Sequence, residues 1–162
     1  MSKLSVHIET FGCQMNVADS ERVASKLRAE GFRLSEAADS ADVVLLNTCS
    51  IREKAEQKVF RRVDEIKRER VGRQPLVGVM GCVAQLEGEA IFNSSPSVQL
   101  IIGTGATDRI PDLLGRVSGG ERRVIDLDAP EEGAVFDVSP AARHSKHVAF
   151  VPDQLAELPS SV

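Results

Sequence analysis

The chain contains no tryptophan and no tyrosine, and six phenylalanines are its only aromatic residues. A folded core must therefore be aliphatic, and the hydrophobic content of 42% is ordinary for a globular domain. No apolar run approaches the roughly 18 to 20 residues that cross a bilayer, so we expect no membrane segment. The amino-terminal residues lack a signal-peptide pattern, and we expect a cytoplasmic protein.

Cysteine is scarce as well, with three residues in 162. An odd number of cysteines in a reducing compartment argues against a closed disulfide framework and favours thiol chemistry or metal binding. The formal net charge of −4 excludes the strongly basic domain that is typical of a stand-alone nucleic-acid binder. A local basic excess lies between Arg52 and Arg73, and we interpret it as a solvated helix face rather than an RNA contact.

Apolar runs and helical periodicity alternate along the first 128 residues. Strands are predicted at Ser5–Gly12, Ala41–Thr48, Leu76–Gly81, Val98–Ile102 and near Arg123–Leu127. Helices are predicted from about Asp19 to Gly31, from the N-cap Ser50 to before Gly72, near Ala84–Phe92, and after a capping Asp108.

This alternation predicts an α/β fold, Rossmann- or flavodoxin-like, with a mostly parallel sheet of about four or five strands and flanking helices. We expect the domain to span residues 1–128. Periodicity fades beyond it, so residues 129–162 are predicted to be a linker and an irregular tail.

Cys13, Cys49 and Cys82 each follow one of the first three long apolar runs. Because the carboxyl ends of parallel strands meet at one edge of a sheet, we expect the three thiols to converge there. Converging thiolates are ligands for a soft metal or an iron–sulfur cluster. For a single cysteine, burial in the core is the simpler interpretation. Gly12 and Gly81 precede two of the cysteines and allow close approach of the backbone to a bulky ligand.

Spacing alone leaves the metal open. The C-x₂-C pairs that are common in structural zinc sites are absent, whereas a catalytic zinc with three thiolates, or a [4Fe–4S] cluster with one iron lacking a protein ligand, both fit. Polar residues flank the cysteines and are predicted to hydrogen-bond to cluster sulfurs, the alternative role being helix capping. These residues are Gln14, Asn16, Asn47, Thr48 and Ser50.

Two further patterns carry less chemistry. Gly103-Thr-Gly105 before a helix has the look of a phosphate turn but lacks a third glycine and a following GK[ST], so we interpret it as an ordinary turn. His144 and His147 lie in predicted linker without a cysteine or carboxylate pattern, and we interpret them as solvent-exposed.

The wording around the cysteines is more specific. The three motifs are Phe11-Gly-Cys-Gln-Met-Asn16, Asn47-Thr-Cys-Ser-Ile-Arg-Glu-Lys-Ala55 and Gly78-Val-Met-Gly-Cys-Val-Ala-Gln85. In order and context they resemble the amino-terminal domain of the methylthiotransferases, which are radical S-adenosylmethionine enzymes that insert a methylthio group into tRNA or a ribosomal protein. The chain looks most like the branch that modifies the adenine of N6-isopentenyladenosine in tRNA. The resemblance covers residues 6–114 and more loosely extends to Pro152.

The resemblance implies that Cys13, Cys49 and Cys82 hold an auxiliary [4Fe–4S] cluster, whose open iron carries the sulfur that is transferred. In the full-length family a second [4Fe–4S] cluster, bound by a CxxxCxxC motif in a barrel, cleaves S-adenosylmethionine to a radical. A small carboxy-terminal module binds tRNA.

The expected CxxxCxxC motif does not follow Pro152, and the chain reads Asp153–Val162 without another cysteine. We therefore expect an incomplete enzyme that binds the auxiliary cluster, is inactive alone, and self-associates through exposed apolar surface. Two alternatives stay open: a non-catalytic iron–sulfur or metal-binding module, and a flavodoxin-like domain whose cysteines are only packed or redox-active.

Overall fold

The computed structural model describes residues 3–12, 14–49 and 53–128. These residues form six strands: β1 (Ser5–Thr10), β2 (Arg33–Leu34), β3 (Val43–Thr48), β4 (Leu76–Gly81), β5 (Val98–Ile102) and β6 (Val124–Asp126). The helices are α1 (Gln14–Ala29), α2 (Glu53–Glu69), α3 (Cys82–Glu87), α4 (Ala90–Ser94) and α5 (Ile110–Ser118), with 3₁₀ turns η1 (Ala38–Ser40) and η2 (Thr107–Arg109). The predicted linker and tail over 129–162, with His144 and His147, lie outside the described residues.

The six strands form one sheet in the order β2-β1-β3-β4-β5-β6, and every pair is parallel. The predicted α/β class is thereby confirmed. The sheet has one strand more than the upper number expected, namely β2, which consists of Arg33 and Leu34 alone. Two residues are too few to show the alternation by which a strand is recognised in sequence.

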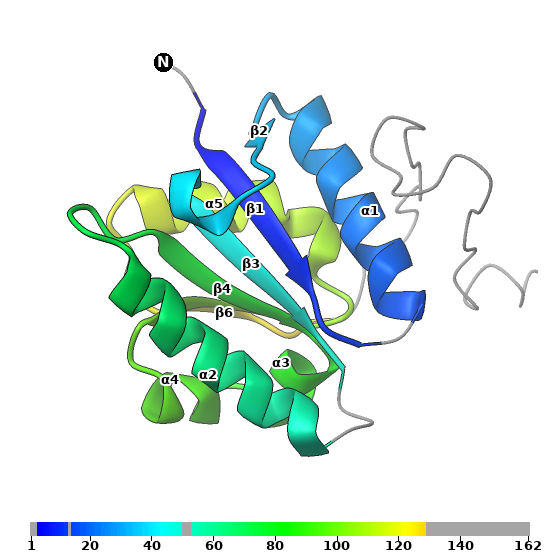
Figure 1. Cartoon of the computed structure of the whole chain (residues 1–162). Helices are drawn as coiled ribbons and strands as arrows, with labels where there is room; N and C mark the ends of the chain where they lie inside the picture. The colour runs from blue at the N-terminus through cyan, green and yellow to red at the C-terminus, as the bar shows by residue number, and fades with distance from the viewer. Residues whose placement is uncertain (1–2, 13, 50–52, 129–162) are drawn as a thin grey trace, which may run out of the picture.

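Helices cover both faces of this sheet (Figure 1). α1 and α5 pack on one face, and α2, α3 and α4 pack on the other. The central strand β3 contributes to both layers, since Val43 and Leu45 belong to the first core and Val44 and Leu46 to the second. This double burial explains why its sequence is a continuous apolar run rather than an alternating one.

The direction of the connections reverses between β1 and β3. From β1 the chain crosses through α1 to the edge strand β2, whereas from β3 it crosses through α2 in the opposite direction to β4. Helices leaving β1 and β3 consequently lie on opposite faces of the sheet. In open α/β sheets ligands bind at the carboxyl edge beside such a reversal of strand order. The connections β4 to β5 and β5 to β6 both proceed in the same direction across the sheet. The helices α3 and α4 of the first connection lie on one face, whereas α5 of the second lies on the other, so the two crossovers have opposite handedness.

Three predicted helix boundaries were wrong. α1 begins at Gln14 rather than near Asp19, because its first turns bury the polar Asn16, which interrupts an apolar stripe. The predicted helix over Ala84–Phe92 is two short helices, separated at Gly88, where φ is +51°. Asp108 lies within η2, and α5 has no side-chain cap.

Candidate functional site

Cys49 and Cys82 lie at neighbouring strand ends on the carboxyl edge of the sheet. Thr48, the last residue of β3, pairs with Gly81, the last residue of β4. Each cysteine comes directly after one of these partners, so the register brings the two residues to the same level. Cys49 is 5% exposed and Cys82 is partly exposed. Cys13 lies outside the described residues.

The backbone after β1 lies against Cys49. A Cβ atom added at Gly12 would lie 2.6 Å from the Cβ of Cys49 and would overlap the side-chain oxygen of Asn16. The φ of Gly12 is +148°, in the region that favours glycine. One residue before it, the amide of Phe11 donates to the carbonyl of Asn47 at 2.7 Å, which joins β1 to β3 at the same edge.

Gly81 allows a similarly close approach between β4 and β3. Its φ is +97°, and an added Cβ atom would lie 2.7 Å from Oδ1 of Asn47 and would overlap the carbonyl oxygen of Thr48. The sequence predicts that Gly12 and Gly81 allow close approach of the backbone to a bulky ligand, and this stays a prediction. In the structure their missing side chains admit protein atoms of the neighbouring strand end, so these glycines bring the strand ends together.

A buried hydrogen-bond network of side-chain amides and hydroxyls joins α1 to the ends of β1 and β3. Asn16 is 3% exposed, and its Nδ2 donates to Oδ1 of Asn47 at 3.0 Å and to the carbonyl of Thr48 at 2.9 Å. Asn47 is fully buried, and its Nδ2 donates to the carbonyl of Asn16 at 2.8 Å and to Oγ of Ser20 at 2.9 Å. The Ser20 hydroxyl lies 2.7 Å from that of Thr10 in β1.

The side-chain amides of Asn16 and Asn47, which the sequence predicts as hydrogen-bond donors to cluster sulfurs, donate to protein groups in this network. Each amide group has two hydrogens, and both are used within the protein in Asn16 and in Asn47. The Thr48 hydroxyl donates to the carbonyl of Met80 at 2.9 Å. Gln14 is exposed on the first turn of α1, and Ser50 lies outside the described residues. A bond from Asn16 or Asn47 to sulfur would require the exchange of one of these contacts.

A charged cluster on β1, which the sequence pattern did not reveal, lies on the α2 side of the sheet. Arg62 of α2 makes a two-pronged ion pair with Glu9, with Nη2 2.8 Å from Oε1 and Nε 2.9 Å from Oε2. Nε2 of His7 lies 3.6 Å from the same carboxylate, and Nδ1 of His7 lies 2.9 Å from the carbonyl of Ser35.

These contacts shift the acid–base behaviour of the cluster. Burial alone would raise the pKa of Glu9, but His7 and Arg62 outweigh it and lower that pKa to about 2. The Glu9 carboxylate raises the pKa of His7 against the opposing effect of burial. The cluster is therefore a salt bridge between β1 and α2, in which both carboxylate oxygens of Glu9 are bonded to Arg62.

Among the described residues, no group of three or more His, Cys, Asp or Glu side chains is arranged to hold a metal ion. Cys13 is not among these residues, so the three-cysteine set stays a prediction. Two thiols at adjoining strand ends are soft donors, and this donor chemistry fits an iron–sulfur cluster better than a hard cation.

The turn at Gly103 is occupied by protein groups. The amide of Thr104 donates to Oε1 of Gln85 at 3.2 Å, and the amide of Ala106 donates to the carbonyl of Gly103 at 3.1 Å. Both amides therefore serve the protein's own contacts, in agreement with the interpretation of this segment as an ordinary turn.

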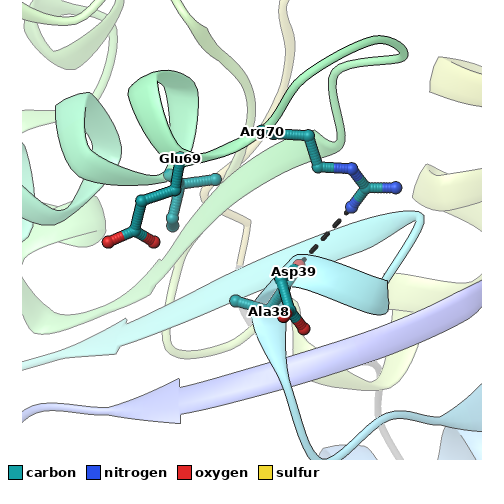
Figure 2. A pocket seen from close by; sticks show the side chains of 5 residues that line it. Ala38, Asp39, Glu69 and Arg70 are labelled. Atoms are coloured by element: carbon teal, nitrogen blue, oxygen red, sulfur yellow. Dashed lines mark hydrogen bonds between the residues drawn. The ribbon is translucent and has the colours of Figure 1, made fainter.

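Two pockets lie at the opposite, amino edge of the sheet. One is lined by residues of η1, the end of α2 and Arg70, which directly follows α2. Figure 2 shows the Arg70 side chain pointing toward Ala38, whose carbonyl accepts a bond of 3.5 Å from Nη1. Nη1 of Arg70 also contacts the carbonyl of Ala41. The other lies between the end of α2 and the starts of β4 and β5. Neither adjoins the cysteines.

The predicted basic face from Arg52 to Arg73 is partly neutralised by such contacts. Arg62 pairs with Glu9 and with Glu65 and Glu69 of its own helix, and Arg70 binds backbone carbonyls. Within the described residues no helix has the length and apolar character to span a membrane.

Comparison with known proteins identifies the motifs. The model of the "Uncharacterized protein family UPF0004" matches residues 5–103. A tRNA-2-methylthio-N(6)-dimethylallyladenosine synthase of Cereibacter sphaeroides is 53% identical over 126 residues, which are 77% of this chain and 29% of that protein. The synthase of Solibacter usitatus is 44% identical over 151 residues, 93% of this chain and 34% of its own length.

A third synthase, from Sphingopyxis alaskensis, is 42% identical over 150 residues, which are 93% of this chain and 33% of the relative. The chain therefore spans about a third of the length of the curated relatives that it matches. These matches confirm the resemblance to the methylthiotransferases that the three cysteine motifs predicted. By the extent of the family match, the chain belongs to the UPF0004 family, as a domain that it shares with tRNA-2-methylthio-N(6)-dimethylallyladenosine synthases.

Proposed function

We propose that this chain is the auxiliary-cluster domain of a tRNA methylthiotransferase, in which Cys13, Cys49 and Cys82 bind a [4Fe–4S] cluster. The observation that carries the proposal is the register of β3 and β4, which brings Cys49 and Cys82 to adjacent strand ends. The contact between Gly12 and Cys49 supports the third ligand, because residue 13 directly follows Gly12 in the sequence.

The residues of the chain divide the work at this edge. The three cysteines would bind iron as thiolates, and three protein ligands leave one iron of a four-iron cluster open to a sulfur-containing group. Gly12 and Gly81 allow the strand ends to approach, and the Asn16–Asn47 pair holds them in register. Gln14 and Ser50 stay predicted as hydrogen-bond donors to cluster sulfur.

The relatives are named as synthases of 2-methylthio-N(6)-dimethylallyladenosine in tRNA. We propose the same overall reaction for an enzyme that contains this domain, with tRNA as its partner, S-adenosylmethionine as its second substrate and the cytoplasm as its compartment. The three cysteines of these 162 residues are all assigned to the auxiliary cluster, which leaves no CxxxCxxC set. These residues alone are therefore expected not to methylthiolate tRNA.

Anaerobic reconstitution with iron and sulfide tests the proposal. We expect broad visible absorbance and about four irons per chain. Replacement of Cys13, Cys49 or Cys82 by alanine should abolish stable loading, whereas Met15→Ala, at an exposed position within the first motif, should load like the parent. Loading that survives all three single replacements would overturn the assignment. Sedimentation of the same samples tests the predicted self-association.

The chemistry beyond cluster binding has its own test. Mixing the loaded chain with S-adenosylmethionine and isopentenylated tRNA should give no methylthio product by nucleoside mass spectrometry. Product formation by these 162 residues would contradict the division of labour between this domain and a radical-generating barrel. If the chain binds a cluster but Cys→Ala replacement leaves the activity of a complete enzyme unchanged, a non-catalytic iron–sulfur module would be favoured.

A further inference from the structure

The helix that begins with Cys82 has little packing of its own. α3 is six residues long and buries two side chains, Val83 and Ala84. Its flanking residues, Gly81 and Gly88, supply no side-chain cap. Isolated helices of this length do not form in water, so contacts to the rest of the protein must hold α3 in place. The position of the Cys82 thiol depends on those contacts.

Gln85 provides a polar contact of that kind, one helical turn after Cys82. Its Oε1 accepts from the amide of Thr104 at 3.2 Å, and its Nε2 donates to the carbonyl of Leu127 at 3.3 Å. Thr104 follows the end of β5, and Leu127 follows the end of β6. One side-chain amide therefore joins α3 to two strand ends that are far from it in sequence.

The surroundings of Gln85 are shaped to receive it. A Cβ atom added at Gly103 would overlap Oε1 of Gln85 and would lie 3.0 Å from the Cα atom of Leu127. The amide of Gly103 donates to the carbonyl of Asp126 at 2.7 Å, so β5 and β6 are joined directly beside the glutamine. A side chain at position 103 would displace Gln85 from this seat.

We propose that Gln85 is a positioning residue for Cys82, fixing the first turn of α3 so that the thiol faces the cysteine edge. The inference rests on the proposed cluster site for its purpose, although the link from Gln85 to Thr104 and Leu127 stands without it. Gln85 does not touch iron or substrate in this assignment. It acts through the helix that carries the ligand.

Gln99 offers a matched control. Its Oε1 accepts from the amide of Val77 at 3.2 Å, so it also joins a side-chain amide to backbone. This contact lies where β4 and β5 begin, at the edge opposite the cysteines. A general loss of stability should follow from either replacement, whereas an effect on Cys82 should follow from Gln85 alone.

The first test needs no cluster. The metal-free chain is treated with iodoacetamide, and the alkylation rate of each cysteine is measured by peptide mass spectrometry. In Gln85→Ala we expect Cys82 to react about threefold to tenfold faster, since loss of such a hydrogen bond frees the short helix locally. Cys49 should keep its rate, and Gln99→Ala should change neither. Equal acceleration at Cys49 and Cys82, or the same effect in Gln99→Ala, would overturn the inference.

The second test uses the reconstituted chain. Gln85→Ala should lose iron to a chelator several times faster than the parent and should shift the electron paramagnetic resonance spectrum of the reduced cluster, and Gln99→Ala should do neither. Gln85→Glu keeps the acceptor for Thr104 but sets a carboxylate against the carbonyl of Leu127, so it should fall between parent and Gln85→Ala.

The two proposals fail in different ways. If the parent does not load iron, the proposed function fails while the alkylation rates still decide the role of Gln85. If the parent loads and Gln85→Ala matches it in alkylation, iron loss and spectrum, the positioning role fails alone.

Discussion

Asn16 and Asn47 exchange hydrogen bonds across the carboxyl end of the sheet, with Nδ2 of Asn16 3.0 Å from Oδ1 of Asn47 and Nδ2 of Asn47 2.8 Å from the carbonyl of Asn16. The pair joins the start of α1 to the end of β3, where the strand order reverses between β1 and β3. Because Cys49 lies two residues after Asn47, we infer that the pair fixes the position of the strand end that carries this cysteine.

Truncation of the pair should therefore cost stability. Asn47→Ala removes the acceptor of one Nδ2 hydrogen of Asn16 and a donor to the Asn16 carbonyl, both in a buried site. A buried polar group that loses its hydrogen bond costs about 1–3 kcal/mol. We expect a loss of that size in the free energy of unfolding, measured by urea titration. Asn93→Ala, at an exposed position on α4, should change it by less than about 0.5 kcal/mol. Equal effects of the two replacements would contradict the role of the pair.

Gly81 and Gly72 separate backbone strain from steric overlap, because their φ angles are +97° and +98°. Nothing lies within 4 Å of a Cβ atom added at Gly72, whereas one added at Gly81 overlaps the carbonyl oxygen of Thr48. Gly72→Ala should cost about 1–2 kcal/mol, the penalty of the left-handed conformation. Gly81→Ala should cost at least about 2 kcal/mol more, or prevent folding, since overpacking adds its own penalty. Urea titration and circular dichroism measure both; similar losses would show that the strand ends can separate at little cost.

The His7–Glu9–Arg62 cluster predicts a pH dependence. The folded pKa of Glu9, at about 2, is below its unfolded value, so its contribution to stability is present above the unfolded pKa and is lost as the pH falls through this range. The folded pKa of His7 is raised, so its contribution is present at low pH and is lost as the pH rises through about 6.5 and beyond.

Glu9→Gln removes both effects. We expect this variant to be about 1–2 kcal/mol less stable than the parent near pH 6 and to lose this deficit between about pH 5 and pH 2, with partial exposure keeping the figure small. Chemical denaturation over a pH series measures it. Glu89→Gln, at an exposed position between α3 and α4, is the control and should follow the parent curve. A constant offset at every pH would attribute the loss to packing rather than to charge.

Two ion pairs of equal length test the value of burial. Nε of Arg109 lies 2.7 Å from Oδ2 of Asp126, and Nε of Arg116 lies 2.7 Å from Oε2 of Glu121. The first pair is mostly buried, with side chains 21% and 12% exposed, and the second is 53% and 52% exposed.

Asp126→Asn should therefore cost about 1–3 kcal/mol, because it leaves a partly buried guanidinium without its carboxylate beside β6. Glu121→Gln should cost less than about 0.5 kcal/mol, since exposed pairs contribute little. Thermal unfolding at low and high salt distinguishes them, and the Asp126 effect should persist in salt. An equal and salt-sensitive loss in both variants would rule out the dependence on burial.

Local pattern was sufficient for the strands that run through the core. The run from Val43 to Leu46 is apolar at every position, and the structure buries all of it. The β5 bounds were predicted correctly as Val98–Ile102, and the stripe containing Val59, Val63 and Ile66 faces the second core as a helix face should. The cysteine motifs also identified the family, because their amino-acid sequences are specific enough to be recognised without any knowledge of the fold.

What the pattern missed are features that depend on neighbours. β2 could not be predicted because two residues are too few to show a periodic pattern. The start of α1 was missed because its first turn buries Asn16, whose side-chain amide donates to Asn47 of β3. No rule applied to the sequence near Gln85 would indicate that its amide meets Thr104 and Leu127.

The sequence by itself determined the α/β alternation, the aliphatic core and the family, since periodicity, composition and short motifs are properties of adjoining residues. The tertiary structure decided which strand ends meet, why Gly12 and Gly81 must be glycine, and that Arg62 pairs with Glu9. These contacts join residues that are distant along the chain, and they form only when the strand order β2-β1-β3-β4-β5-β6 sets β1 beside β3.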